Sequence, residues 1–339
     1  MKTRIGFYLH QALIIVGLFL VFACSCKKED DIRIPVLSTS EVTNILQLSA
    51  QSGGIITSDE GFVVSARGVC WSLNVNPTIA DNKTSDGTGA GSFTSEITGL
   101  TADTTYYVRA YATNSKGTGY GSTMVFKTMG NTFTDPRDGN VYKIVTIGSQ
   151  IWMAENLRYL PGVASSSSGS NTNTRYYVYD YNGMNVSVAK ATTNYQTYGV
   201  LYNWPAAMAG ASSSSSNPSG VQGICPVGWH LPSDAEWTQL TDYLGGPSLA
   251  GGKLKEDGTI HWSSPNTGAT NESGFAALPG GSRVYTGEFN YIGSNGFWWS
   301  ATESTTDNAG IRSMRHNTSS VSRSFYIKEW GFSVCCVRD

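Results

Sequence analysis

The sequence predicts an all-β sandwich followed by an α+β domain, and three observations support this fold class. With 339 residues, the chain is too long for one ordinary core and indicates two domains plus extensions. Charged residues make up only 14% of the chain beside 38 glycines, a composition typical of β-rich, loop-rich extracellular proteins. Short alternating apolar runs extend from Val36 to Thr128, whereas tryptophans, Gly-rich turns and helical patterns enter from Phe133 onward.

The charge balance excludes one class of partner. The formal net charge is −2, and no Lys/Arg cluster follows Lys28. A protein that binds nucleic acid needs a basic face to neutralise phosphates. We therefore expect no nucleic-acid partner.

The first residues carry an export signal. Lys2 and Arg4 form a positive segment, and Ile5 to Ala23 is almost entirely apolar. This pattern predicts a signal peptide over residues 1–23. A transmembrane anchor is the alternative, because the apolar run is almost long enough to span a bilayer.

A cysteine at the end of this run indicates how the exported chain is held. The segment VFACSCKKEDD, Val21 to Asp31, resembles the lipobox of bacterial lipoproteins, in which the cysteine is acylated and becomes the mature N-terminus. Cys24 is the favoured lipidation site and Cys26 the alternative. The Lys-Lys-Glu-Asp-Asp run resembles the surface-export signal of lipoproteins from Bacteroidetes-type bacteria, with a merely solvated tether as the alternative. The resemblance implies an outer-membrane lipoprotein at the cell surface, anchored by lipid, with residues 24–35 as a tether.

Residues 36–129 are expected to form the sandwich. Strand-like runs occur at Gly61–Ser72, Gly89–Leu100 and Thr104–Gly121. In the last run two alternating sets of side chains, Tyr106 to Ala112 and Tyr107 to Thr113, should face inward and outward. Cys70 lies between Val69 and Trp71 in a strand-like run, so we expect a buried free thiol rather than a reactive one.

One part of this domain resembles the late strand pair of fibronectin type III sandwiches. The matching residues are Leu100, Thr104, Tyr106, Val108 and Ala110. In that family a tyrosine near the strand start hydrogen-bonds back to the preceding corner, and the resemblance places Tyr106 in this role. Such domains commonly act as spacers or adhesion modules.

Two elements of residues 133–339 are well marked. An Asp138-Gly139 turn precedes a predicted hairpin with strands Val141–Ile147 and Gln150–Met153. A helix should begin at Ser233, since Glu236 three residues later completes a capping box. Its apolar face combines Trp237, Leu240 and Leu244, Gly245-Gly246-Pro247 stops it, and a second short helix is expected near Ala250.

The whole segment from Phe133 to Asp339 resembles the Fibrobacter succinogenes major paralogous domain. The matching pieces, in order, are DGNVYKIVTIGSQIWMAENL, YGVLYNW, GICPVGWHLPSDAEW, ALPGGSR, FWWSATE and GFSVCCVRD. This family is common in secreted proteins and lipoproteins, and it implies no particular activity.

A more distant resemblance suggests the fold. GWHLPSDAEW, LPGGS and the terminal GFSVCCVR are similar to segments of formylglycine-generating enzymes, which have a variant C-type lectin-like fold. The resemblance implies a C-type lectin-like domain here. The activity of those enzymes depends on a cysteine pair downstream of Gly-Gly-Ser, and in this chain no cysteine follows Ser282 before Cys335. We therefore do not expect oxidase chemistry.

The remaining cysteines predict a disulfide. An exported chain with Cys225, Cys335 and Cys336 in one domain favours a bridge. The family pattern ends in Arg-Cys, and Cys335 occupies the place of the arginine, so the resemblance implies Cys225–Cys336. Cys335 would then be a free thiol, or the pairing would be the alternative one.

We find no catalytic constellation, metal site or cofactor motif in the sequence. His230 is expected to be a hydrogen-bonded core or turn residue, and Asp234 and Glu236 are helix-start residues before they are an acid pair. The calcium motifs of C-type lectins and the Gly-x-Ser-x-Gly elbow are both missing. The chain is therefore not expected to be an enzyme.

Aromatic residues near the C-terminus form a candidate ligand surface, because aromatic faces stack on sugar rings or anchor protein contacts. The aromatic residues clustered there are Tyr285, Phe289, Tyr291, Trp298, Trp299 and Trp330. The candidate ligand surface is assigned to Tyr285, Tyr291, Trp298 and Trp299, with Glu303 beside them. The alternative is that Trp298 and Trp299, which alternate, place at least one ring in the core. The functional hypothesis is a lipid-anchored surface protein that binds or adheres to a glycan or protein. An enzyme acting on the cell envelope or a polysaccharide, or a structural envelope component, are the alternatives.

Overall fold

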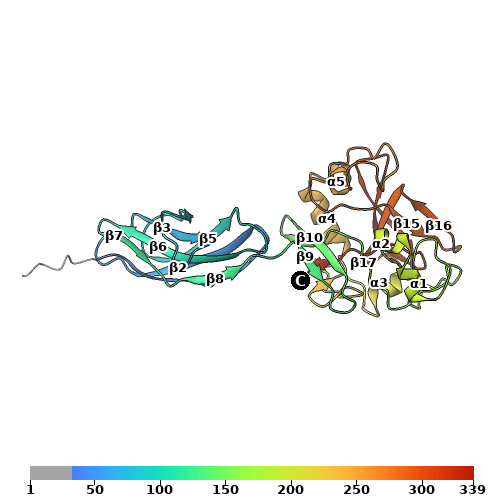
Figure 1. The fold of residues 1–339 in the computed structure, drawn as a ribbon, viewed down its shortest axis with the longest axis horizontal. Coiled ribbons are helices and arrows are strands. Elements are labelled where there is room, and N and C mark those ends of the chain that lie inside the picture. Colours follow the sequence, from blue (N-terminus) through green and yellow to red (C-terminus); the bar gives the residue numbers. More distant parts are fainter. Residues whose placement is uncertain (1–32) are drawn as a thin grey trace, which may run out of the picture.

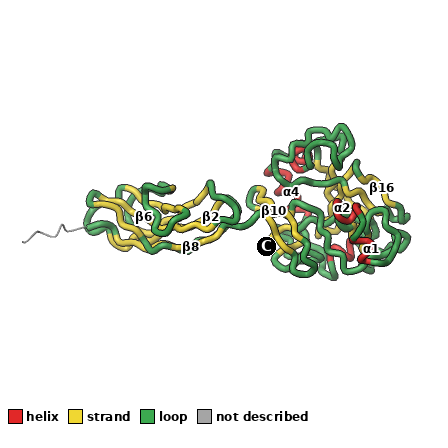
Figure 2. The backbone as a smooth tube through the Cα atoms, in the orientation of Figure 1, coloured by secondary structure: helices red, strands yellow, loops and turns green. Residues whose placement is uncertain are grey.

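The computed structural model describes residues 33–339, so the predicted signal peptide, the predicted lipidation sites Cys24 and Cys26 and most of the predicted tether lie outside the described residues. Two lobes follow one another along the long axis of the molecule (Figure 1). The first lobe contains only strands and loops, and the second carries the helices (Figure 2). Within residues 33–339, no helix is long and apolar enough to cross a membrane.

The first lobe is a β-sandwich of two antiparallel sheets. One sheet has the order β1-β2-β5, and the other has the order β4-β3-β6-β7 with β8 also paired to β6. The strands are β1 (Val36–Thr39), β2 (Ser49–Ser58), β3 (Ala66–Ser72), β4 (Asn82–Lys83), β5 (Gly91–Thr98), β6 (Thr105–Asn114), β7 (Gly117–Tyr120) and β8 (Met124–Lys127). The run from Gly61 forms one strand, because Val63 is exposed and the ladder begins at Ala66.

The sandwich core lies between the two sheets. Tyr106, Val108, Ala110 and Ala112 of β6 are all buried, as their alternation predicts. The Oη of Tyr106 accepts a hydrogen bond from the backbone N–H of Thr101 at 3.0 Å, which is the corner contact that the fibronectin type III resemblance implies. Cys70 is a buried free cysteine, and burial raises the pKa of its thiol to about 11.

The second lobe combines four small sheets. The largest has the order β14-β20-β11-β10-β9, and the others pair β12 with β13, β15 with β16, and β17 with β18 and β19. The strands are β9 (Thr132–Thr134), β10 (Val141–Ile147), β11 (Gln150–Met153), β12 (Tyr176–Tyr177), β13 (Leu201–Tyr202), β14 (Trp229–His230), β15 (Gly280–Arg283), β16 (Phe289–Ile292), β17 (Asn295–Glu303), β18 (Asn308–Arg315), β19 (Val321–Ile327) and β20 (Val337–Arg338). The hairpin β10–β11 has the predicted bounds.

The helices of this lobe are α1 (Val186–Lys190), α2 (Thr193–Tyr198), α3 (Trp204–Met208), α4 (Asp234–Tyr243) and α5 (Pro247–Leu254). Helix α4 begins with the predicted capping box: Ser233 Oγ accepts from the N–H of Glu236, and Glu236 accepts from the N–H of Ser233. Trp237 and Leu240, on the apolar face of α4, are buried. The capping box sets the start of the helix and so fixes where this face meets the core.

The two ends of the second lobe are tied together. Strand β20 pairs with β11 through Trp152 and Val337 and with β14 through Trp229 and Arg338. Beside it, a disulfide joins Cys225 to Cys336, the pair that the family resemblance implied, with 6.0 Å between the Cα atoms. Cys335 is buried and has no disulfide partner.

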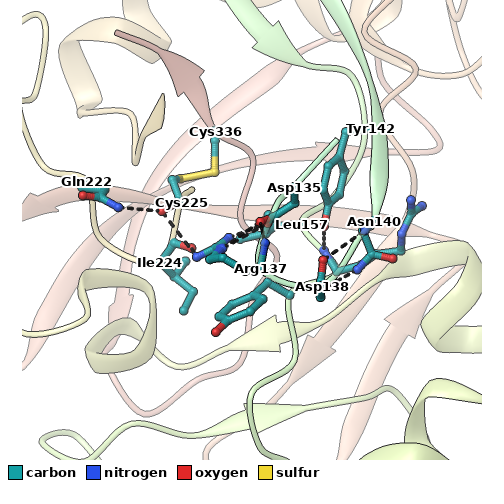
Figure 3. A network of polar contacts seen from close by, with 12 residues as sticks. Asp135, Arg137, Asp138, Asn140, Tyr142, Leu157, Gln222, Ile224, Cys225 and Cys336 are labelled. Atoms are coloured by element: carbon teal, nitrogen blue, oxygen red, sulfur yellow. Dashed lines mark hydrogen bonds and ion pairs between the residues drawn. A yellow bond between two sulfur atoms is a disulfide. The ribbon is translucent and has the colours of Figure 1, made fainter. Parts of the chain in front are cut away.

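An arginine supports the segment that carries Cys225. Arg137 pairs with the fully buried Asp135 at 2.7 Å and donates from Nη1 to the carbonyl of Ile224 at 2.8 Å. Its guanidinium also lies over the ring of Tyr159, 3.8 Å from the centroid. Figure 3 shows this network beside the disulfide. The network holds the backbone next to Cys225 in place, so we assign it a structural role.

A glutamine links the two lobes. The side chain of Gln47, in the first lobe, donates to the carbonyl of Ile144 at 3.0 Å and accepts from the N–H of Thr146 at 3.1 Å. Leu46 of the same loop packs against the core of the second lobe, and its carbonyl accepts from the N–H of Met129. The lobes therefore meet through a specific contact rather than through a bare linker.

Candidate functional site

An open hollow of about 370 Å³ lies beside β16, β17 and the turn between β18 and β19. We call it the aromatic hollow. Its walls combine four aromatic rings with neutral polar groups and two basic side chains: Tyr291, Phe297, Tyr326, Trp330, Ser294, Asn295, Asn317, Arg315 and His316. None of these residues is a carboxylate. This composition suits a polar ligand that has a flat apolar face.

The rings of the hollow form a continuous chain. Tyr291 lies 6.0 Å from Phe297, Phe297 lies 6.4 Å from Tyr326, and Tyr326 lies 4.9 Å from Trp330, measured between ring centroids. Tyr285 extends the chain at 6.3 Å from Trp330. Tyr285 and Tyr291, at the two ends of the extended chain, are 57% and 50% exposed, whereas Phe297 within it is buried. The inner ring therefore supports outer rings that face solvent.

Tyr291 lies near the end of β16, next to the turn that leads into β17. This residue has a φ of +71°, a left-handed conformation that an aromatic residue rarely adopts. The N–H and the Oγ of Ser294 both donate to its carbonyl, at 3.1 and 3.0 Å. Backbone strain of this kind costs on the order of 1–3 kcal/mol and persists only where the surroundings fix it. Here it projects an aromatic side chain at the rim.

The basic wall of the hollow is built by the end of β18 and the turn that follows. Arg315 pairs with Asn295 across the ladder, and the backbone N–H of His316 donates to the carbonyl of Ser294 at 2.9 Å. His316 Nδ1 lies 2.9 Å from the carbonyl of Ser264, so it donates there, because a carbonyl only accepts. The other ring nitrogen of His316 is left for the hollow.

A buried lysine holds this turn from behind. Lys255 is 0% exposed, and its Nζ donates to the carbonyls of Thr267, Arg315 and Thr318 at 3.0, 3.1 and 2.8 Å. Its ammonium also lies 5.3 Å from the ring centroid of Trp262. Burial lowers the pKa of Lys255 to about 8. One core side chain thus fixes the backbone on both sides of His316 and Asn317.

The structure corrects the role expected for Trp298 and Trp299 as ligand-surface residues. They are 1% and 0% exposed, so neither can contact a ligand. Trp298 Nε1 donates to Asn156 at 2.8 Å and its ring packs 6.4 Å from Trp237 of α4, whereas Trp299 Nε1 donates to the carbonyl of Tyr202 at 2.7 Å. Alternation does not place one ring outward, because β17 has other elements on both faces.

Glu303 is exposed but lies apart from the hollow. It ends β17, and Asn295, which lines the hollow, begins this nine-residue strand, so the strand separates the two by at most about 26 Å at ~3.3 Å per residue, less the shortening at the irregularity after Trp299. Glu303 pairs with Lys328 at 2.6 Å, and the Lys328 ammonium lies over the ring of Trp204. Of the five predicted surface residues, only Tyr285 and Tyr291 lie together at the candidate site.

His230 and Glu236 form a buried polar pair in the core of the second lobe. His230 Nε2 lies 2.6 Å from Glu236, and Nδ1 lies 2.7 Å from Asp339. Burial disfavours the charged ring, but the hydrogen bonds and charges of Glu236 and Asp339 outweigh it, so the pKa of His230 is raised. Glu236 also accepts from the N–H groups of Ser219 and Ser233. The pair links helix α4 to β14 and the end of the chain.

Sequence reasoning missed Tyr326, Arg315, His316 and the polar rim at Ser294, Asn295 and Asn317. One signal was available for Tyr326, because Arg323, Phe325 and Ile327 alternate with it in an amphipathic strand. The others lie in turns or at the ends of β17 and β18, and only the fold brings them beside Tyr291. Across residues 33–339, no group of three or more His, Cys, Asp or Glu side chains is arranged to hold a metal ion.

Comparison with known proteins identifies the second lobe. A family model described as the Fibrobacter succinogenes major domain matches residues 145–338. No curated protein matches the chain. Among solved structures, the sensor domain of the anti-sigma factor RsgI4 from Pseudobacteroides cellulosolvens is 18% identical, covers 28% of this chain and 95% of its own, and has a TM-score of 0.23. The third fibronectin III domain of human KIAA0343 protein is 15% identical, covers 34% of this chain and 97% of its own, with a TM-score of 0.24.

Proposed function

We propose that this chain, which belongs to the Fibrobacter succinogenes major domain family, is an extracellular protein that binds a glycan through the aromatic hollow. The observation that carries the proposal is the chain of rings from Tyr291 to Trp330, exposed at Tyr291, half-buried at Trp330 and bordered by amide, hydroxyl and guanidinium groups. Sugar rings pair an apolar face with polar edges, which matches this arrangement.

We further propose that the second lobe is a C-type lectin-like domain that binds without calcium. The hollow contains no carboxylate to hold such an ion, and the calcium motifs of that fold are missing from the sequence. Binding should therefore be unchanged when EDTA removes divalent cations. A loss of binding in EDTA would refute this part of the proposal.

The binding proposal is tested by presenting the purified full chain to an array of glycans and measuring the affinity for each hit. Trp330→Ala and Tyr291→Ala should each weaken binding about tenfold or more, a change of ~1.4 kcal/mol, because each removes a ring from the hollow. Tyr243→Ala is the matched control, since Tyr243 is an exposed tyrosine outside the hollow.

Three results would contradict the proposal. Equal affinity in the Trp330→Ala, Tyr291→Ala and control variants would place binding elsewhere. Release of reducing ends from a polysaccharide by the purified chain would favour the enzyme hypothesis. A protein captured by the chain, with no glycan bound, would favour a protein ligand.

The remaining proposals concern location. The chain is proposed to be lipid-anchored at Cys24, with Cys26 as the alternative, in an outer membrane, and the sandwich is proposed to act as a spacer that carries the second lobe outward. Cells grown with a labelled fatty acid should incorporate label into the wild type and Cys26→Ser but not into Cys24→Ser. Proteolysis of intact cells should remove the second lobe if it faces the medium; full protection would contradict surface exposure.

A further inference from the structure

The charges around the aromatic hollow are unusual for this chain. Five arginines of the second lobe pair with carboxylates: Arg137 with Asp135, Arg158 with Glu155, Arg283 with Glu329, and Arg312 and Arg323 with Asp234. The guanidinium groups of Arg175 and Arg338 have no carboxylate partner within residues 33–339, but they donate to Ser168, Thr174 and Met129. Arg315 differs from them. Within residues 33–339, its guanidinium has no hydrogen bond or ion pair, although its backbone is fixed by the β17–β18 ladder.

A second cation lies behind the same wall. The ammonium of Lys255 donates only to backbone carbonyls, one of them that of Arg315, and within the described part of the chain it has no carboxylate partner. The hollow itself contains no Asp or Glu. Two positive charges thus act on the hollow without a neutralising group, on a chain whose net charge is −2. The positive potential is local, which favours an anion at this place rather than anywhere on the surface.

We infer that the aromatic hollow selects acidic glycans, with the Arg315 guanidinium binding the anionic group while the rings from Tyr291 to Trp330 stack on the sugar. This inference rests on the proposed glycan-binding function and names the class of glycan. Hydrogen bonds between a guanidinium and an anion are about twice as strong as neutral ones, and a carboxylate can accept two in parallel. The amides of Asn295 and Asn317 and the free nitrogen of His316 remain for hydroxyl groups.

The geometry makes Arg315 a specificity-determining residue. Its Cα is held by the Asn295 pairing and by the Lys255 contact, so only the flexible side chain must order on binding. A neutral sugar could still stack on the rings, but it has no anionic group for the guanidinium to bind, so the guanidinium would stay hydrated. The difference in affinity between an acidic glycan and its neutral counterpart should therefore come mainly from one side chain.

The test uses matched polymers that differ only in charge. The full chain is titrated with polygalacturonate and with its methyl ester, and with dextran sulfate and unmodified dextran. The acidic member carries carboxylates in the first pair and sulfates in the second. We expect the acidic member of at least one pair to bind about tenfold or more tightly than its neutral partner, and this preference to fall as salt is raised. The pair that shows the preference identifies the anionic group.

Variants locate the source of the preference. Arg315→Met should remove the preference for the acidic polymer, and Arg315→Lys should retain part of it. Arg175→Met is the control, because the Arg175 guanidinium donates only to Ser168 and Thr174 and lies outside the hollow. Its preference should equal that of the wild type.

The outcomes separate this inference from the function on which it rests. If neutral and acidic polymers bind equally and Trp330→Ala still abolishes binding, the glycan function stands and the charge selection is wrong. If Arg315→Met keeps the full preference, the selection is also wrong. If none of the four polymers and no glycan of the array binds, both the proposed function and this inference are overturned.

Discussion

The buried ammonium of Lys255 donates a hydrogen bond to the backbone carbonyl of Arg315, with 3.1 Å between Nζ and O. Lys255 follows directly after α5, in the interior of the second lobe, whereas Arg315 is the last residue of β18 and lines the aromatic hollow. The contact therefore fixes the backbone of the hollow's wall to a side chain in the core. A surface turn that would otherwise depend on its own residues is fixed by a side chain from elsewhere in the fold.

Lys255→Met keeps the apolar stem but leaves three carbonyls without their donor. Unsatisfied buried groups cost about 1–3 kcal/mol each, so we expect the free energy of unfolding to fall by at least ~2 kcal/mol. The amides after Arg315 should exchange hydrogen faster, and glycan affinity should fall. Lys253→Met is the control, since its partly exposed ammonium pairs with Glu272 at 2.9 Å and contributes less than about 1 kcal/mol. Equal effects in both variants would contradict this role.

Replacing both Cys225 and Cys336 by serine should destabilise the second lobe strongly. The bridge closes a loop with a sequence separation of 111, which corresponds to about 4–5 kcal/mol in the loop-entropy model. Chemical denaturation measures the loss. Mass spectrometry of unreduced peptides should find the Cys225–Cys336 link and a free thiol at Cys335; a Cys225–Cys335 link would show that the pairing is wrong.

His230 should make stability depend on pH. Its pKa is raised in the folded state, so the ring binds a proton more tightly there than in the unfolded chain. This contribution is fully present below the unfolded pKa of about 6.5 and is lost as pH rises through the folded value. The advantage of the wild type over His230→Gln in unfolding free energy should therefore shrink as pH rises above about 6.5.

The control for that experiment is His261→Gln, because His261 pairs with Glu256 at the partly exposed surface, at 2.8 Å. This variant measures the effect of replacing a partly exposed, carboxylate-paired histidine by glutamine. A wild-type advantage that stays constant across this range would show that the proton on His230 is not linked to folding.

Gln47→Ala should loosen the arrangement of the two lobes. It removes the hydrogen bonds to Ile144 and Thr146 at the junction without touching either core. Small-angle X-ray scattering should show a broader distribution of overall dimensions, while the unfolding of each lobe changes little. Gln51→Ala is the control, since Gln51 donates to Glu96 within the sandwich. An unchanged scattering profile would mean that Leu46 and the chain connection alone hold the lobes.

Features that depend on neighbouring residues were predictable from the sequence. The β10–β11 hairpin, the capping box of Ser233 and Glu236 and the inward face of β6 all have the expected positions, because turn chemistry, capping and side-chain period act over a few residues. The corner contact of Tyr106 followed from a family resemblance whose residues lie within one strand and its corner.

Only part of the candidate site was predictable, since the site depends on how strands and helices pack on one another, which a single sequence does not show. Alternation along β17 places at least one of Trp298 and Trp299 in the core, and contacts with α4 on one side and β13 on the other bury both. Tyr291 and Arg315 stand 24 positions apart in the sequence and share a hollow because β17 and β18 pair in a particular register.

By itself, the sequence determined the family, the two-domain order and the local elements, because hydrophobic period, caps and turns are written in short segments. Only the tertiary structure decided which aromatic rings face solvent, that the Arg315 guanidinium has no partner within residues 33–339, and that Lys255 supports the turn beside it. The physical reason is that exposure and charge pairing depend on the packing of distant elements, and a single sequence does not reveal that packing.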